Sequence, residues 1–414
     1  MQGHTFSPFP APGRIADGYE RCPASGPSSS VRRRPNVHGF TRGAALGLLL
    51  LIPAIEAASA QAVIENPAVP KARNAGRVVA AREVLAILDE GRGDYFFQWP
   101  HNVKVAPDGS LFVQDKNQLL QFDKNGKFLR NLFKKGQGPG EMTSVGTCLF
   151  DGKDVIIQAR TPPKLIWLGA AGTYVRETPV RSKTPFLTAL LFYRGVFYMH
   201  SADFPRVEGE PRIVDDPQYI LAFNASTGEA KTLTSFPAKK FAVTSPGGGG
   251  GMFDISKLIA VPFQGAHLAL THTCEYLLKI YNPASDTVLR EFRRAYKRVK
   301  SPPLTEEQKE GGLLIDGKHY TQPQLTYAND VMNLLAHEDM IWAVTSTRDS
   351  EKGVLIDVFG ADGTYADAFY LQLPEAALRN LGYPEMCALG DDGLWIIEPS
   401  KDGTFAIRKY QIRG

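Results

Sequence analysis

The chain has 414 residues, of which 43% are hydrophobic, and a formal net charge of +4. This length and composition suit a folded protein with a large core and exclude a disordered or collagen-like chain. Most of the positive charge belongs to residues 1–60, because the remaining 354 residues carry 41 basic and 40 acidic side chains. A nearly neutral chain lacks the basic balance of a nucleic-acid-binding protein, so we expect no nucleic-acid partner.

The N-terminal 60 residues have the pattern of a secretory leader. Arg32–Arg34 and Arg42 precede an apolar run over residues 44–55, and Ala58-Ser59-Ala60 offers a small-residue cleavage site. The apolar run is too short for a stable transmembrane helix, and no cysteine follows it directly. We therefore expect cleavage after Ala60, no transmembrane span afterwards, and a periplasmic or extracellular protein without a lipid anchor. Residues 1–30 are rich in Pro, Gly and Ser, and we interpret them as preceding the true start of translation near Val31.

Residues 100–141 predict four short antiparallel strands. Asp108-Gly109 and Asn125-Gly126 mark tight turns between apolar segments, since Gly accepts the positive φ that hairpin turns require. The first turn recurs at Gly152 and Gly195, each time 43 residues further on, and Pro384–Trp395 repeats the pattern of Pro100–Leu111. A fixed period in the low forties is typical of a propeller or solenoid, in which each small sheet packs on its neighbours.

Two of these segments, WPHNVKVAPDGSLFVQD and QLLQFDKNGKFLRNLFKKGQGPGE, carry a resemblance to a known family. They resemble the NHL-type repeat of exported bacterial six-bladed β-propeller proteins. The resemblance is specific over Trp99–Val145 and weaker elsewhere. It implies a fold and no particular reaction.

The predicted fold is therefore all-β, a six-bladed β-propeller of four-stranded antiparallel blades. The last blade, from Cys387 to Arg413, supplies only about three strands, and an open sheet edge would be a liability. We predict that Glu83–Leu88 is the missing strand, although the composition of residues 77–88 alone favours a helix. The expected organisation is a leader over 1–60, an extended segment over 61–82 and one propeller over 83–414.

Several segments depart from the repeat. Residues 204–218 are expected to be a charged loop, and the glycine run at 247–251 a connector before the fourth blade. An excursion at 302–324 should cover one face of the propeller and begin with a helix over Thr305–Leu314. The basic run at 290–300 is interpreted as a solvated strand end or, alternatively, a docking patch for an acidic partner.

The three cysteines outside the leader do not predict a zinc site. Cys148 and Cys387 fall in inner strands and are interpreted as small buried thiols. A disulfide that involves Cys274 is left open, because an exported protein meets an oxidising environment. The paired cysteine spacing of a zinc site is missing.

Candidate site residues follow from the position before each inner strand, because these positions form one rim around the propeller axis. We predict a ligand site there for a small anionic or hydroxylated molecule, made by His101, Asn102, Lys257, Asp330 and Glu385. No other cofactor is expected, but His101, Asp330 and Glu385 could hold a divalent metal, calcium or zinc. Pro100-His101 resembles an element of amidating lyases, and Glu385, Asn102 and Asp330 resemble in type the set used by gluconolactonase-like propellers.

Two functions remain open from the sequence. The first is an exported, monomeric, non-catalytic scaffold that binds a small polar ligand or a partner protein. The alternative is a metal-dependent lyase or lactonase with its site at the central mouth of the propeller. The sequence contains no Gly-x-Ser-x-Gly nucleophile elbow and no His-Glu-x-x-His motif.

Overall fold

The structure is a computed structural model and describes residues 62–89, 93, 95–181, 186–245, 250–272, 274–310, 312–400 and 403–412. The predicted leader and the start near Val31 lie outside these residues, as does most of the glycine run. In the described part of the chain, no helix is both long and apolar enough to cross a bilayer.

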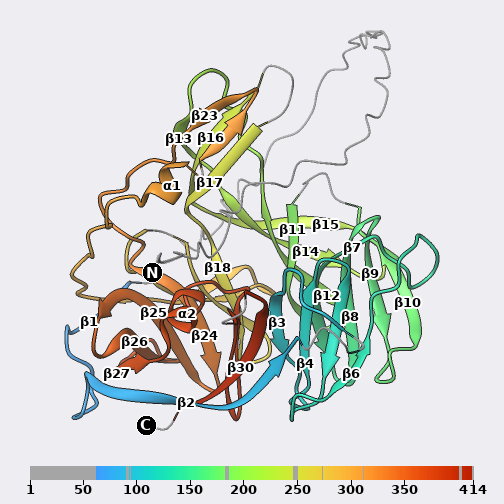
Figure 1. Cartoon of the computed structure of the whole chain (residues 1–414), viewed down its shortest axis with the longest axis horizontal. Coiled ribbons are helices and arrows are strands. Elements are labelled where there is room, and N and C mark those ends of the chain that lie inside the picture. The colour runs from blue at the N-terminus through green and yellow to red at the C-terminus, as the bar shows by residue number, and fades with distance from the viewer. Residues whose placement is uncertain are drawn as a thin grey trace, which may run out of the picture. The chain divides into compact units, whose positions relative to one another are not determined.

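The strands form the six predicted blades, in each of which neighbouring strands are antiparallel (Figure 1). Blades one and two follow the chain directly, as β3 (His101–Val105), β4 (Leu111–Asp115), β5 (Gln118–Phe122) and β6 (Phe128–Asn131), then β7 (Ser144–Asp151), β8 (Asp154–Thr161), β9 (Pro163–Leu168) and β10 (Tyr174–Pro179). Blades three and four are β11 (Phe186–Tyr193), β12 (Val196–Ala202), β14 (Gln218–Asn224) and β15 (Ala230–Phe236), then β18 (Ile259–Phe263), β19 (His267–Thr271), β20 (Leu278–Asn282) and β21 (Thr287–Arg294). Blade five is β24 (Val331–His337), β25 (Met340–Asp349), β26 (Gly353–Gly360) and β27 (Tyr365–Gln372), and blade six contains β28 (Cys387–Gly390), β29 (Gly393–Pro399) and β30 (Phe405–Ile412).

The first strands of the blades surround a common centre. Contacts join β7 with β11, β11 with β18, β18 with β24, β24 with β28 and β28 with β3. The repeated turns that predicted this arrangement have the expected backbone: Gly109, Gly126, Gly152 and Gly195 all have positive φ, between 58° and 81°.

The ring closes through β2 (Arg77–Leu88), as predicted from the incomplete last blade. Residues 81–88 pair antiparallel with β30, from Ala81 opposite Ile412 to Leu88 opposite Ala406. Residues 77–80 pair in parallel with β27, so that β2 joins blades five and six into one continuous eight-stranded sheet. Figure 1 shows β2 in blue, passing from β27 to β30. A strand therefore forms where composition alone favours a helix, because both neighbouring sheets offer an unpaired edge.

The segment before residue 77 also belongs to the sheets. β1 (Ile64–Asn66) pairs in parallel with β21 and covers the outer edge of blade four. The extended segment expected at 61–82 thus contributes β1 to blade four and the beginning of β2, which joins blades five and six.

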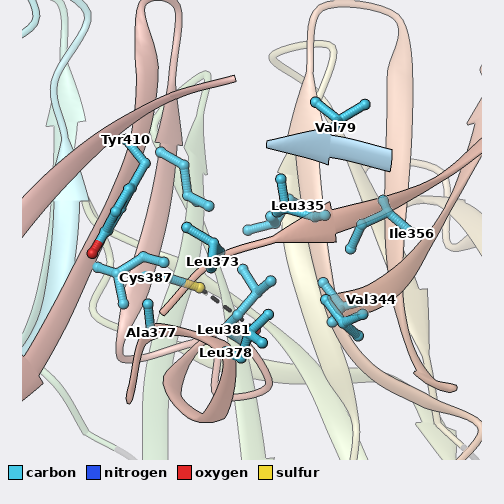
Figure 2. Packing of buried hydrophobic residues seen from close by; sticks show 14 of the residues in the cluster. Val79, Leu335, Val344, Ile356, Leu373, Ala377, Leu378, Leu381, Cys387 and Tyr410 are labelled. Carbon is cyan, nitrogen blue, oxygen red and sulfur yellow. Dashed lines mark hydrogen bonds between the residues drawn. The ribbon is translucent and has the colours of Figure 1, made fainter. Parts of the chain in front are cut away.

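Apolar clusters fill the spaces between neighbouring blades. Figure 2 shows the cluster between blades five and six, where Cys387 and Tyr410 from one blade approach Leu335, Val344 and Ile356 from the other. A short helix, α2 (Glu375–Asn380), was not expected from the sequence and adds Ala377 and Leu378 to this cluster. Sheets too thin to bury both faces alone are stabilised in this way by their neighbours.

Glutamine side chains add hydrogen bonds from one blade to the next. Gln114 Nε2 donates to the carbonyl of Val145, 2.7 Å away. Gln158 spans the next junction, donating to the carbonyl of Leu187 and accepting from the amide of Ala189. These buried side chains thereby satisfy their own polar atoms while they bridge neighbouring blades.

Three segments that depart from the repeat form strands instead of loops. β13 (Arg212–Asp215), β16 (Lys239–Thr244) and β17 (Gly250–Ser256) form a three-stranded sheet, and β22 (Leu313–Ile315) and β23 (Lys318–Tyr320) form a hairpin that contacts it through β17. Together these five strands are called the excursion sheet. The helix expected over Thr305–Leu314 is only α1 (Glu306–Glu310), and the loop expected at 204–218 contains β13. A small core that includes Phe241, Val243 and Leu313 explains the difference, because alternating apolar residues can bury one face of a sheet.

Candidate ligand site at the mouth of the propeller

The predicted rim residues lie at one end of the propeller. His101 and Asn102 begin β3, and Lys257, Asp330 and Glu385 come just before β18, β24 and β28. Because the first strands of all six blades run in the same direction around the ring, the positions at which they begin fall at the same end. This end, which also carries the insertions of the excursion sheet, is called the mouth.

Lys257 and Glu385 share their surroundings with Asp254 of β17. Burial raises the pKa of Asp254, the positive charges of Lys257 and Lys240 oppose this, and the negative charges of Asp216 and Glu385 add to it. Asp254 is nevertheless exposed to solvent, and Lys257 and Glu385 are half-buried. The charges of Lys257 and Glu385 therefore lie close enough to Asp254 to act on it. None of these three side chains makes an ion pair with another described residue.

A buried polar chain lies behind this cluster, at the junction of blade three and the excursion sheet. Lys240 Nζ lies 2.7 Å from Asp216 Oδ2, and both side chains are at most 4% exposed. Gln218 donates to Asp216, and its carbonyl oxygen lies 2.9 Å from His200 Nε2. That oxygen also accepts from the amide of Leu258, so His200 must carry its proton on Nε2.

Burial lowers the pKa of His200 to about 4, and the positive charges of Lys240 and Lys257 act in the same direction. The imidazole is therefore neutral at neutral pH. It donates to Gln218 on the neighbouring strand of blade three and adds no charge to the mouth.

Asp330 and Asn102 form hydrogen bonds with other residues of the chain. Arg298 Nε donates to Asp330 Oδ1 at 3.1 Å, and the carboxylate is only 3% exposed. Burial raises the pKa of Asp330, whereas Arg298 lowers it. Asn102, with a positive φ of 49°, donates to Gln114 and to the carbonyl of Gly146 and so joins blades one and two.

His101 is half-buried, and its Nδ1 lies 2.8 Å from the carbonyl of Trp99. Across the described ranges, no three His, Cys, Asp or Glu side chains are grouped closely enough to hold a metal ion. The metal set of His101, Asp330 and Glu385 stays a prediction. The cysteines at 148, 274 and 387 are all free, with no disulfide at Cys274.

Three arginines of the basic run at 290–300 form ion pairs within the chain. Arg293 pairs with Glu65 of β1, Arg294 with the buried Asp357, and Arg298 with Asp330. These arginines hold β1, blade five and the mouth in place. Arg290, Lys297 and Lys300 of the same run are exposed, and the docking patch for an acidic partner stays a prediction.

Sequence reasoning missed Asp216, Lys240 and Asp254. All three lie in or beside the excursion sheet, whose strands were interpreted as connections between blades. The alternation in Lys240–Thr244 and in Met252–Ile255 is the signal that could have placed two of them on strands.

Comparisons with known proteins agree with the fold. Residues 86–192 match the model of a family described as DUF5128, 6-bladed beta-propeller. No curated protein matches the sequence.

Solved structures with a similar fold include a protein of Bacteroides fragilis described as exported (10% identity, 85% of this chain and 100% of that chain covered, TM-score 0.47). Others are a member of the DUF4221 family from Bacteroides vulgatus (12%, 82% and 99%, TM-score 0.48) and a gluconolactonase from Xanthomonas campestris (11%, 82% and 99%, TM-score 0.41). At these identities the likeness concerns the fold alone.

Proposed function

We propose that this chain is an exported β-propeller of the NHL type whose mouth binds a small polar ligand without chemical conversion. The observation that carries the proposal is the group formed by Asp254, Lys257 and Glu385. These charged side chains come from two separate segments, residues 254–257 and the start of blade six, act on one another electrostatically and have no ion-pair partner among the described residues. Charges held in a partly buried place without partners destabilise a fold unless something else compensates them, and a bound ligand would do so.

The charges suggest the kind of ligand. Lys257 offers a positive charge to an anionic group, while Asp254 and Glu385 accept hydrogen bonds from hydroxyl or ammonium groups. A small zwitterion or hydroxy acid has both features. Export is proposed from the leader pattern in residues 32–60, which would make the ligand one from outside the cytoplasm. A partner protein at the excursion sheet is the other class of ligand that the same end of the molecule could receive.

Calorimetric titration of the exported protein with amino acids, hydroxy acids and dicarboxylic acids tests the proposal. At least one of these probes should bind, and Lys257→Met and Glu385→Gln should each weaken it by about tenfold, or about 1.4 kcal/mol. Lys153→Met is the matched control, because Lys153 is an exposed lysine in the β7–β8 turn, at the other end of blade two. Binding that all variants share equally, or no binding at all, would contradict the proposal.

Metal analysis of the same preparation separates the scaffold from the enzyme alternative. The proposal expects no stoichiometric metal. Calcium or zinc bound at one ion per chain and lost in His101→Ala or Glu385→Ala would instead favour a metal-dependent lyase or lactonase.

A further inference from the structure

A small cavity lies on the side of blade three. It has a volume of about 130 Å³ and is lined by Ser201, Asp203, Tyr219, Leu221 and Thr232. None of these residues belongs to the cluster of Asp254, Lys257 and Glu385. The volume corresponds to about four water molecules at ~30 Å³ each, so the cavity can take a small molecule or one end of a larger one.

The strand register explains why the cavity is open. Ser201 of β12 lies opposite Tyr219 of β14, and Leu221 lies opposite Thr232 of β15. The pairing of β14 with β15 shifts register between Ile220 and Leu221, which bends the sheet locally. The small side chains of Ser201 and Thr232 then leave a hollow beside the larger Tyr219.

One side chain in this hollow lacks a partner. Ser201 is 1% exposed, and its hydroxyl makes no hydrogen bond with any described residue. A buried hydroxyl without a partner is unfavourable, and such groups in native proteins usually meet a water or a ligand. The position of Ser201 in the cavity lining places that missing partner inside the cavity.

The other lining groups are mainly hydrogen-bond acceptors. Burial raises the pKa of Tyr219, and the charge of Asp203 and its hydrogen bond with the phenol raise it further, so the phenol stays protonated and its proton is engaged. Lys240 Nζ donates to the carbonyl of Asp203 at 3.2 Å and so fixes the loop that carries this carboxylate. Leu221, which is buried, and the ring of Tyr219 add apolar surface.

We propose that this cavity binds a neutral, hydroxyl-rich ligand, namely a polyol or the terminal residue of a sugar. Asp203 accepts from ligand hydroxyls, and Ser201 and Thr232 can both donate and accept. An anion would be repelled by Asp203. A simple cation would leave the donor capacity of Ser201 and Thr232 unused, whereas each ligand hydroxyl supplies both a donor and an acceptor. The Tyr219 ring can cover the apolar face of a sugar.

Ligand-observed NMR on the full exported protein tests this proposal with glycerol, D-glucose and 2-aminoethanol as probes. Glycerol and D-glucose should bind, weakly because the cavity contacts few ligand atoms. Asp203→Asn and Thr232→Val should each reduce the affinity at least fivefold. Asp215→Asn is the matched control, an exposed carboxylate of the same insertion that does not line the cavity.

Thr232 is exposed, so Thr232→Val tests the cavity without a change to the buried Ser201, which would disturb the core. Lys257→Met and Glu385→Gln should leave polyol binding unchanged, which separates this site from the mouth. The proposal is overturned if neither polyol binds, if Asp203→Asn and Thr232→Val bind as well as the wild type, or if 2-aminoethanol binds in preference to glycerol.

Discussion

His200 and His272 show how burial controls single residues in this fold. Burial lowers the pKa of both imidazoles from 6.5 to about 4. Neither ring nitrogen of His272 makes a well-formed hydrogen bond with a described residue, although the carbonyl of Pro237 is near enough to favour the charged form slightly. Its ring packs 5.2 Å from that of Phe236. Between about pH 4 and pH 6.5, both histidines are therefore neutral in the folded protein but protonated in the unfolded chain.

We predict that stability falls as the pH drops from about 6.5 to about 4. In this window the unfolded chain binds a proton at each histidine and the folded chain does not, so each contributes a loss of about 1.36 kcal/mol per pH unit. His272→Phe should remove roughly half of this pH dependence and leave the fold intact, because the phenyl ring needs no hydrogen bond. Urea unfolding at pH 7, 6 and 5 measures the pH dependence of the free energy of unfolding. His337→Phe, at the β24–β25 turn, is the control, and an unchanged slope in His272→Phe would contradict the prediction.

The sequence placed individual residues at the mouth but not their partners. The repeat register correctly put Lys257 and Glu385 before inner strands. It could not show that Arg298 would pair with Asp330 or that Asn102 would donate to Gln114. Those contacts depend on the conformation of loops that lie outside the repeated pattern. Side-chain partners are fixed by tertiary packing, which strand periodicity does not encode.

At the scale of elements, one buried carboxylate joins blade four to blade five. Asp357 of β26 is fully buried and accepts hydrogen bonds from Tyr276, Tyr365 and Arg294, with the Arg294 Nη2 at 2.6 Å. The guanidinium also lies over the rings of Tyr276, Tyr365 and Tyr296. Because every group in this arrangement has a partner, we interpret it as a structural link and not as a site.

Removing the charge of Asp357 should be severe. Asp357→Asn leaves Arg294 buried without a counter-charge, and we predict a loss of about 3–5 kcal/mol in the free energy of unfolding. Tyr365→Phe removes one hydrogen bond and should cost only about 1 kcal/mol. Chemical denaturation measures both, with Asp151→Asn in the exposed β7–β8 turn as the control. A loss below 1 kcal/mol in Asp357→Asn would show that the link is not needed.

The elements that follow the repeat were predictable, and those between repeats were not. Gly109, Gly152 and Gly195 marked the blades because a tight turn restricts its residues strongly. β16 and β17 were not predicted, because their sheet has no counterpart elsewhere in the chain. The helix expected to reach Leu314 ends at Glu310, before the pair Gly311-Gly312, since glycine disfavours helix continuation.

At the scale of the whole molecule, the ring depends on one strand. Ile87 of β2 is 3% exposed and packs with Trp395, Ile407 and Phe122, that is, with blades six and one. The closure was predictable because a blade with too few strands needs a partner. The parallel pairing of β1 was not, since three residues without a pattern give no signal.

Ile87→Ala should destabilise the protein by about 2–5 kcal/mol, because it leaves a cavity where two blades and β2 meet. Val84→Ala in the same strand is the matched control: Val84 is 43% exposed, and its loss should change stability by at most ~0.5 kcal/mol. Thermal and urea unfolding compare the two. Equal effects of both substitutions would mean that β2 does not hold the ring closed.

The pairing of Ala81 with Ile412 also sets an order of events during synthesis. Ala81 is made long before Ile412, so the early sheets can form while this pair is still incomplete. Contacts between residues so distant in sequence form slowly, because the intervening chain must first lose much of its freedom. Until the two strands meet, β2 and β30 each expose a bare strand edge, and this is the stage at which chaperones would be needed most.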